Sequence, residues 1–429
     1  MIHDLYQKYL NSTGISTDTR NIRKGNIFFA LKGPNFNANK FAGQALESGA
    51  SYTVIDDPDE KIDARMLLVN DGLQTLQELA RLHRSNLKIP VFGLTGSNGK
   101  TTTKELINAV LSQKYKTHST QGNLNNHIGV PLTILGMNDS TEIGIIEMGA
   151  NKIGEIRELC QISRPTHGLI TNIGQAHIEG FGSLEGVLRG KSELYDWLLN
   201  QRGTVFYNST DPVLANMAKR FASPLSYPGE NDYYHCSLEK KLPYISIKAE
   251  NDMIIQTRLI GGYNFLNIAA ALCVAKFFDV PFTACRQAIE NYEPRNNRSQ
   301  ILKKDSNTLI LDAYNANPSS MEAALNHLNE LDSDNRIAIL GDMFELGDYA
   351  EEGHGKIGEI TKQMDLKLVI FCGDKMKHAF EKNRDARYFQ TRNELEGFLK
   401  NFTFENSTIL IKGSRAMALE NIVEKLKSK

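Results

Sequence analysis

The sequence predicts an α/β protein with two or three domains. Its 429 residues exceed what one compact hydrophobic core usually organises. Short apolar runs alternate with stretches of helical spacing, and many of these runs end in Gly, Asp, Asn or Ser. This alternation is typical of βαβ units around a parallel sheet.

The composition narrows the functional class. Lysine and arginine total 49 against 50 acidic residues, so the net charge of -1 gives no general signature of nucleic-acid or lipid binding. The N-terminal sequence does not read as a signal peptide, no window is apolar enough to span a membrane, and we expect a cytosolic protein. A reducing compartment also fits the scattered cysteines, which form no CxxC pair: Cys160, Cys236, Cys273, Cys285 and Cys372.

The first block of the chain, residues 1–89, reads as a small α/β domain. Three strand-like runs, "NIFFALKG", "SYTVID" and "MLLVN", are separated by polar turns. The block ends in "LQTLQELARLHRSN", whose apolar residues follow helical spacing.

The second block, residues 90–297, and the third, 298–429, repeat the alternation. The second contains the strand candidates "VFGLTG", "EIGIIEMGA" and "HGLITNIG" and the helix candidate "NFLNIAAALCVAKFF". The third contains "NTLILDAYNAN", "RIAILGDM", "LKLVIFCGD" and "STILIKGSR". Ligands of open α/β sheets collect at the carboxyl ends of strands, so the polar residues that end these runs are the candidates for chemistry.

The segment "GLTGSNGKTTT" predicts a phosphate-binding loop. Residues 95–99 follow a strand and Lys100 opens a helix, so glycine-rich backbone, helix N-terminus and lysine would converge on phosphate oxygens. The Thr101 hydroxyl suits a Mg²⁺ ion. The strict GxxxxGK[ST] pattern requires glycine where the chain has Leu94, and the competing interpretation is a glycine-rich turn with a solvated lysine.

Three further residues are candidates whose ordinary interpretations compete with a functional one. Glu147 ends a strand beside the loop and could be a magnesium ligand or a surface acid. His177 follows another strand. A lone histidine more often has a structural role than a functional one. Lys191 lies on a predicted helix and would ordinarily be solvated. The guanine-reading NKxD pattern is absent, which favours ATP over GTP.

A set of motifs then resembles one family. The motifs are "LTGSNGKTTTKE", "GNLNNHIGVPLT", "IIEMGANKIGEI", "TNIGQAHIEGFGS", "YNFLNIAAAL", "LDAYNANPSSM", "GDMFELGD" and "KGSRAMALE". In this order, and over nearly the whole chain, they resemble the Mur ligases. The resemblance implies a UDP-binding domain (1–89), a central P-loop ATPase domain with a mainly parallel sheet (90–297), and a Rossmann-like domain that closes on ATP (298–429).

The resemblance also implies a reaction. It is closest to the branch that joins D-alanyl-D-alanine to UDP-N-acetylmuramoyl-tripeptide through an acyl phosphate, during cytoplasmic peptidoglycan synthesis. ATP and two Mg²⁺ ions would be needed, and we expect a monomer. The opening "STDTRNIRKGNIFFALKG" looks like the family's UDP-binding segment.

Residue roles carry over from the matching motifs. Lys100 would act on the transferring phosphate, and Thr101, Glu147, His177 and Lys191 would serve the metals, Lys191 as a carbamate. The residues that would contact ATP are Thr95, Gly96, Ser97, Asn98, Gly99, Lys100, Thr101, Thr102, Asn264, Asn267, Arg298 and Asp312. Helix capping is the competing interpretation for Asn264.

Further residues match the substrate-binding segments. Those facing the UDP-substrate would be Thr17, Asp18, Thr19, Arg20, Asn123, Asn125 and Asn126. Those closing on the dipeptide would be Tyr314, Asn315 and Asn317. His354 would lie on the same closing face, without an assigned chemical role.

Other functions remain as alternatives. A sister ligase adding the third residue would be expected to carry a DNPR-type motif, and "YNANPSS" stands in the comparable region. A folylpolyglutamate-type ligase would not need the UDP-binding segment. A non-catalytic ATP-binding switch module is disfavoured by the presence of Lys100, Glu147 and the Asp312 motif.

Overall fold

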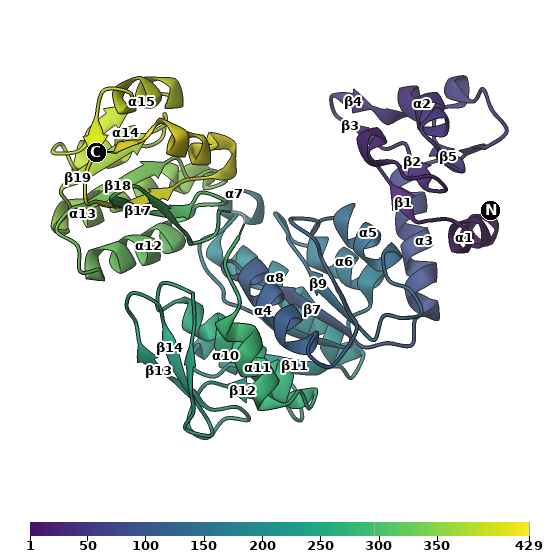
Figure 1. The fold of residues 1–429 in the computed structure, drawn as a ribbon. Helices are drawn as coiled ribbons and strands as arrows, with labels where there is room; N and C mark the ends of the chain where they lie inside the picture. Colours follow the sequence, from purple (N-terminus) through teal and green to yellow (C-terminus); the bar gives the residue numbers. More distant parts are fainter. Residues whose placement is uncertain (296, 429) are drawn as a thin grey trace.

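The computed structural model describes residues 1–295 and 297–428. Three groups of helices and strands follow one another along the chain, and Figure 1 shows the first and third as separate arms on the central group. Each group contains a largely parallel sheet, which confirms the predicted α/β class. Among the described residues, no helix combines the length and apolar character needed to cross a bilayer.

The first group contains a four-stranded parallel sheet of order β1-β2-β5-β6. Strands β2, β5 and β6 lie within the apolar runs predicted from the sequence, because buried residues such as Phe28 and Val54 fill them, whereas β1 lies outside these runs. The elements are α1 (Ile2–Leu10), β1 (Ile15–Ser16), β2 (Ile27–Phe29), β3 (Lys32–Gly33), β4 (Phe36–Asn37), α2 (Ala42–Glu47), β5 (Tyr52–Ile55), β6 (Met66–Leu68) and α3 (Gly72–Asn86).

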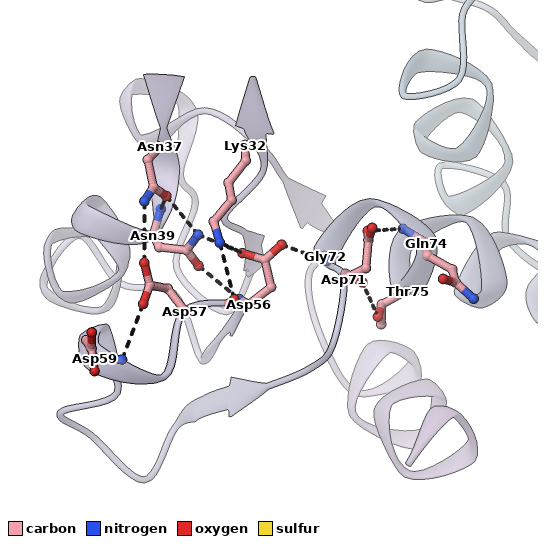
Figure 2. A network of polar contacts seen from close by, with 10 residues as sticks. All are labelled: Lys32, Asn37, Asn39, Asp56, Asp57, Asp59, Asp71, Gly72, Gln74 and Thr75. Carbon is pink, nitrogen blue, oxygen red and sulfur yellow. Dashed lines mark hydrogen bonds and ion pairs between the residues drawn. The ribbon is translucent and has the colours of Figure 1, made fainter. Parts of the chain in front are cut away.

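A polar network holds the β3–β4 hairpin on this sheet (Figure 2). The Asp56 carboxylate, which follows β5, accepts hydrogen bonds from Asn39 Nδ2 at 2.8 Å and from the Gly72 amide at 3.2 Å. It also pairs with Lys32 Nζ at 3.0 Å. Because Asn39 is buried, these bonds fix the hairpin relative to the start of α3.

Helix α3 fastens the first group to the central one. The buried Arg84 guanidinium donates to the carbonyls of Ser163 at 2.8 Å and Arg164 at 3.1 Å. His83 Nε2 lies 2.9 Å from the Met137 carbonyl, and Tyr9 Oη donates to the Leu135 carbonyl at 2.7 Å. These bonds satisfy backbone carbonyls that end helices of the central group.

The central group is built on a six-stranded parallel sheet of order β12-β11-β10-β7-β9-β8. The strands are β7 (Val91–Thr95), β8 (Thr117–Ser119), β9 (Ile143–Glu147), β10 (His167–Ile170), β11 (Thr204–Asn208) and β12 (Leu225–Tyr227). Strand β7 lies between β10 and β9, and Leu94 pairs in register with Glu147. This register brings the end of β9 beside the loop that follows β7.

Helices cover this sheet, and a three-stranded antiparallel sheet is added to it. The helices are α4 (Lys100–Leu111), α5 (Gly129–Leu135), α6 (Glu155–Ser163), α7 (Ile178–Phe181), α8 (Leu184–Asn200), α9 (Pro212–Ala218), α10 (Asn264–Phe277) and α11 (Phe282–Glu290). The added strands are β13 (Cys236–Lys240), β14 (Ser246–Ala249) and β15 (Ile254–Gln256).

The third group contains a six-stranded sheet of order β16-β17-β22-β18-β19-β20, antiparallel only between β16 and β17. Asp312 pairs in register with Lys412. Strands β21 and β23 form a separate two-stranded sheet. The strands of the two sheets are β16 (Gln300–Lys304), β17 (Asn307–Asp312), β18 (Arg336–Gly341), β19 (Leu368–Cys372), β20 (Arg387–Phe389), β21 (Thr403–Phe404), β22 (Thr408–Lys412) and β23 (Lys427–Ser428). The α-helices are α12 (Pro318–Glu330), α13 (Ala350–Gln363), α14 (Lys377–Lys382) and α15 (Arg392–Leu399).

Candidate active site

A cavity of about 830 Å³ lies where the central group faces the third group. Most of the residues that the sequence singled out line this one cavity, although they come from distant parts of the chain. They are Ser97, Asn98, Gly99, Lys100, Thr101, Thr102, Asn123, Asn125, Asn126, Glu147, His177, Asn264, Asn267, Arg298, Asp312, Tyr314, Asn315 and Asn317.

The loop between β7 and α4 has the strand–loop–helix form of a phosphate-binding loop. Gly96 and Gly99 adopt φ angles of 147° and 78°, which side chains rarely allow. A Cβ atom on Gly96 would lie 2.0 Å from Thr171 Oγ1, and one on Gly99 would lie 2.6 Å from Asn267 Oδ1. Glycine is therefore required at both positions, and the first turn of α4 opens directly onto the cavity.

The Lys100 side chain folds back over this loop. Its Nζ donates to the carbonyls of Gly96 at 2.7 Å and Ser97 at 3.1 Å. Burial lowers the pKa of Lys100 to about 8, and the Glu147 carboxylate opposes that shift. The ammonium is thus still mainly protonated at neutral pH and lies where a phosphate would meet the loop.

Glu147 ends β9 on the floor of the cavity and is only 1% exposed. Its Oε1 accepts hydrogen bonds from Thr101 Oγ1 at 3.1 Å and Asn125 Nδ2 at 2.8 Å. Its Oε2 is buried without any hydrogen-bond partner. A buried carboxylate oxygen left unsatisfied beside a threonine hydroxyl fits a hard cation such as Mg²⁺, which prefers oxygen ligands.

This cation site would be open rather than a protein cage. Among the described residues there is no group of three or more His, Cys, Asp or Glu side chains placed to hold a metal. Mg²⁺ commonly takes one or two protein oxygens together with substrate phosphates and waters, so the Glu147–Thr101 pair is sufficient.

His177 lies at the contact between the central and third groups. It precedes α7 with a φ of 57°, and its Nδ1 contacts the Glu345 carboxylate from the third group. The amide of Glu179 donates to the Glu345 carbonyl at 3.2 Å. The His177 hydrogen bond lowers the pKa of Glu345. The structure therefore gives His177 a partner in the third group that the sequence did not predict.

Lys191 is completely buried, in contrast to the solvated lysine that its helix alone would suggest. Its Nζ lies 3.4 Å from the Ala150 carbonyl and 5.3 Å from the centre of the Phe181 ring. Burial lowers the pKa of Lys191 well below its usual value, and the nearby Lys100 charge adds to this effect. Burial here therefore favours the neutral amine, which is the nucleophilic form of lysine, over the ammonium.

Asn264 and Asn267 form one hydrogen-bonded pair at the start of α10. Asn267 Nδ2 donates to Asn264 Oδ1 at 2.8 Å, and Asn264 Nδ2 donates to the Ile260 carbonyl. Thr103 Oγ1 donates to Asn267 Oδ1 at 3.0 Å, which ties α10 to α4. Local hydrogen bonding thus accounts for much of Asn264, while both residues still line the cavity.

The Asp312 motif connects the third group to the phosphate-binding loop by a hydrogen bond. Lys412 Nζ donates to Asp312 at 2.6 Å and to the Asn315 carbonyl at 3.1 Å. Asn317, which caps α12, donates through Nδ2 to Asn98 Oδ1 at 2.8 Å. Lys412 was not predicted as a site residue. The sequence signal for it was a lysine at the end of a buried apolar strand.

Two aromatic–cation contacts flank Tyr314. The Arg298 guanidinium carbon lies 3.6 Å from the centre of the Tyr314 ring, and that of Arg415 lies 4.9 Å from it. Arg298 Nε is buried without a hydrogen-bond partner. Arg415 is a second residue that the sequence did not single out.

His354 has a structural role within the third group. It is fully buried, its Nε2 accepts from the Met343 amide at 3.0 Å, and its Nδ1 lies 2.6 Å from the Ala350 carbonyl. These bonds require the neutral ring protonated at Nδ1. They hold the "GDMFELGD" segment, which carries Glu345, on α13.

We expect this histidine to make the protein acid-sensitive. Burial lowers the pKa of His354 to about 4. Between pH 6.5 and 4, this histidine is therefore mainly protonated in the unfolded chain and mainly neutral in the folded chain. Stability is therefore lost as the pH falls, by about 2 kcal/mol at pH 5 from this residue. Chemical denaturation at pH 7 and pH 5 should show a smaller loss for His354→Gln. The exposed His3→Gln is the control, and equal losses in all three proteins would contradict the assignment.

The segment Thr17–Arg20 lies on the first group and does not line the cavity. Asp18 caps a short 3-10 helix and forms an ion pair with Arg20 at 2.7 Å, with the arginine side chain 86% exposed. The structure therefore keeps this segment apart from the phosphate-binding loop.

Comparisons with known proteins match this architecture. Residues 94–275 match the family model of the Mur ligase middle domain, and residues 297–415 match that of the Mur ligase glutamate ligase domain. The UDP-N-acetylmuramoyl-tripeptide–D-alanyl-D-alanine ligase of Bacillus subtilis is 35% identical, over 96% of this chain and 93% of its own. The chain belongs to the Mur ligase family.

Solved Mur ligase structures share the fold over almost the full length. A crystal structure of MurF from Acinetobacter baumannii is 30% identical and superposes with a TM-score of 0.86, covering 98% of both chains. MurF from Thermotoga maritima, solved with ADP, gives a TM-score of 0.84 at 26% identity and covers 97% of both chains. Both confirm the Mur ligase architecture of three α/β parts.

Proposed function

We propose that this chain is the ATP-dependent ligase that joins D-alanyl-D-alanine to UDP-N-acetylmuramoyl-tripeptide. The observation that carries the proposal is the single cavity in which Lys100, Glu147 and the Asp312–Asn317 motif meet. The full-length likeness to ligases of this name supports the choice of substrates. The product is UDP-N-acetylmuramoyl-pentapeptide, with ADP and phosphate, which belongs to peptidoglycan synthesis in the cytoplasm.

In the first step, a terminal carboxylate oxygen of the tripeptide attacks the γ-phosphorus of ATP and ADP leaves. Two anions must approach each other, so positive charge has to be concentrated between them. Lys100 supplies a full charge, and the amides of the first turn of α4 supply fixed donors at a helix N-terminus. The product is an acyl phosphate.

In the second step, the dipeptide amine attacks the acyl carbon. The tetrahedral intermediate expels phosphate and leaves an amide after the nitrogen loses its proton. Water would also attack the acyl phosphate. The Asp312 motif, which contacts the loop through Asn317 and Asn98, would exclude water from this intermediate.

Magnesium would be held by Glu147 and Thr101, since Glu147 lines the cavity and one of its carboxylate oxygens has no hydrogen-bond partner. When bound, the ion neutralises charge on the phosphates during transfer. His177 is proposed to serve a second magnesium, and Asn264, Asn267 and Arg298 to contact the nucleotide. The first block, 1–89, is proposed to bind the UDP end of the substrate.

Lys191 is proposed to be carbamylated. Its neutral amine would attack CO₂ at carbon and lose a proton, giving an anionic oxygen donor beside the second metal. Protein incubated with ¹³C-bicarbonate should give a carbamate signal in ¹³C NMR that disappears in Lys191→Gln. Lys104→Gln removes another buried lysine, whose Nζ donates to the Thr120 carbonyl, and should keep the signal. A signal that survives in Lys191→Gln would refute the modification.

The function is tested by phosphate release from ATP and Mg²⁺ with UDP-N-acetylmuramoyl-tripeptide, with and without D-alanyl-D-alanine. Release that requires both substrates, with a pentapeptide product by mass, establishes the ligase. Release that responds to a single amino acid instead would indicate a sister ligase. ATP binding without turnover for any acceptor would indicate a switch module.

A further inference from the structure

Arg415 is an exposed cation beside a residue that lines the cavity, and the proposed chemistry does not use it. Its guanidinium carbon lies 4.9 Å from the centre of the Tyr314 ring, and Tyr314 lines the cavity. Within residues 1–295 and 297–428, no carboxylate forms an ion pair with Arg415. The neighbouring cation Lys412, in contrast, is neutralised by Asp312 at 2.6 Å.

The backbone that carries Arg415 is fixed. The Ser414 amide donates to the Asp342 carbonyl at 3.0 Å, and Ser414 Oγ accepts from the Phe344 amide at 2.9 Å. Arg415 then opens a 3-10 helix, Arg415–Met417. A cation held on a rigid segment and supported by an aromatic ring loses little freedom when it binds an anion.

Tyr314 links Arg415 to the Asp312 motif, which contacts the phosphate-binding loop. Asn317 contacts the phosphate-binding loop at Asn98, Tyr314 comes one short turn of chain earlier in the same motif, and Arg415 lies over the Tyr314 ring. An extended dipeptide spans about 7 Å, at roughly 3.5 Å per residue. Its amine and its carboxylate are therefore far enough apart to be contacted by different parts of the site.

We propose that Arg415 binds the free C-terminal carboxylate of the dipeptide acceptor and thereby selects a dipeptide over a single amino acid. This inference rests on the proposed function. The guanidinium presents two parallel N–H groups that match a carboxylate. The phosphates of ATP already have Lys100, the first turn of α4 and the Glu147 cation site, so a second anion is the fitting partner for Arg415.

The selection follows from length. With its amine at the acyl phosphate, a single amino acid would present its carboxylate about 3.5 Å short of the position that a dipeptide reaches. The charge of Arg415 would then be left without a contact, and the amino acid would lose the binding that the dipeptide gains.

The test is steady-state kinetics of Arg415→Gln. We expect the KM for D-alanyl-D-alanine to rise about tenfold to a hundredfold, with the KM values for ATP and the nucleotide substrate changed less than about twofold. A dipeptide with a C-terminal carboxamide should be a poor acceptor for the wild type, whereas Arg415→Gln should use acid and amide alike. Arg415→Lys should keep part of the preference for the acid.

Arg387→Gln is the matched control. Arg387 is another exposed arginine of the third group, and it lies 4.8 Å from the ring of Phe398, which, unlike Tyr314, does not line the cavity. An unchanged dipeptide KM in Arg415→Gln, or a shift confined to the KM for ATP, overturns the inference while leaving the ligase function standing. Absence of dipeptide-dependent turnover in the wild type would refute the proposed function itself.

Discussion

Replacing Lys100 by Met is expected to lower kcat for phosphate release by about a thousandfold. The methionine keeps the length of the side chain and its packing but removes the full charge that contacts the loop carbonyls of Gly96 and Ser97. The charge is needed most when the tripeptide carboxylate approaches the γ-phosphate, so kcat should fall far more than ATP affinity.

The matched control for this variant is Lys104→Met. Lys104 lies one turn further along α4, is buried, and donates to the Thr120 carbonyl at 2.8 Å. Its loss should reduce stability without a comparable effect on kcat. Rates followed by phosphate release, with folding checked by circular dichroism, separate the two effects. Similar kcat values in the wild type and Lys100→Met would rule out the proposed role.

Replacing Glu147 by Gln is expected to lower kcat about a hundredfold and to raise the Mg²⁺ concentration required for half-maximal rate at least about tenfold. The substitution preserves the shape of the side chain and a hydrogen bond toward Thr101, but it removes the charge on the partnerless oxygen. Titration of the rate with Mg²⁺ at saturating ATP measures both quantities.

Glu142→Gln controls for the loss of an acid near the same strand. Glu142 immediately precedes β9, at its opposite end, and accepts from the Lys116 amide at 2.7 Å. Its substitution should leave the Mg²⁺ dependence as in the wild type. If Glu147→Gln also kept that dependence, the cation would have to be held elsewhere.

Local patterns predicted the parts of the molecule whose contacts are close in sequence. The apolar run 91–95, its glycines and the following helix are neighbours, so the phosphate-binding loop could be predicted almost residue by residue. Glu147 could also be anticipated, because parallel strands end at the same edge of a sheet. The helix predicted at 73–86 is α3 (Gly72–Asn86).

Contacts between distant segments were beyond the sequence patterns. Lys412 contacts Asp312 only because β22 pairs with β17. Glu345 contacts His177 only because the third group lies against the central group. The burial of Lys191 likewise depends on tertiary packing, here against Phe181. The β13–β15 sheet was missed since its strands are short and mix polar with apolar residues.

The attachment of α3 has a further consequence for how the chain folds. One continuous apolar cluster includes Leu5 and Ile27 from the first block together with Val130 and Ile134 from the central block. The first block also has a cluster of its own around Phe28 and Ile55, but the shared cluster joins the two blocks, so much of their structure is expected to be gained and lost together. A weakened α1 would then reduce the population of enzyme with an intact phosphate-binding loop, although it lies far from any reacting atom. The first and central blocks are separate along the sequence, but their shared apolar cluster is expected to couple their folding.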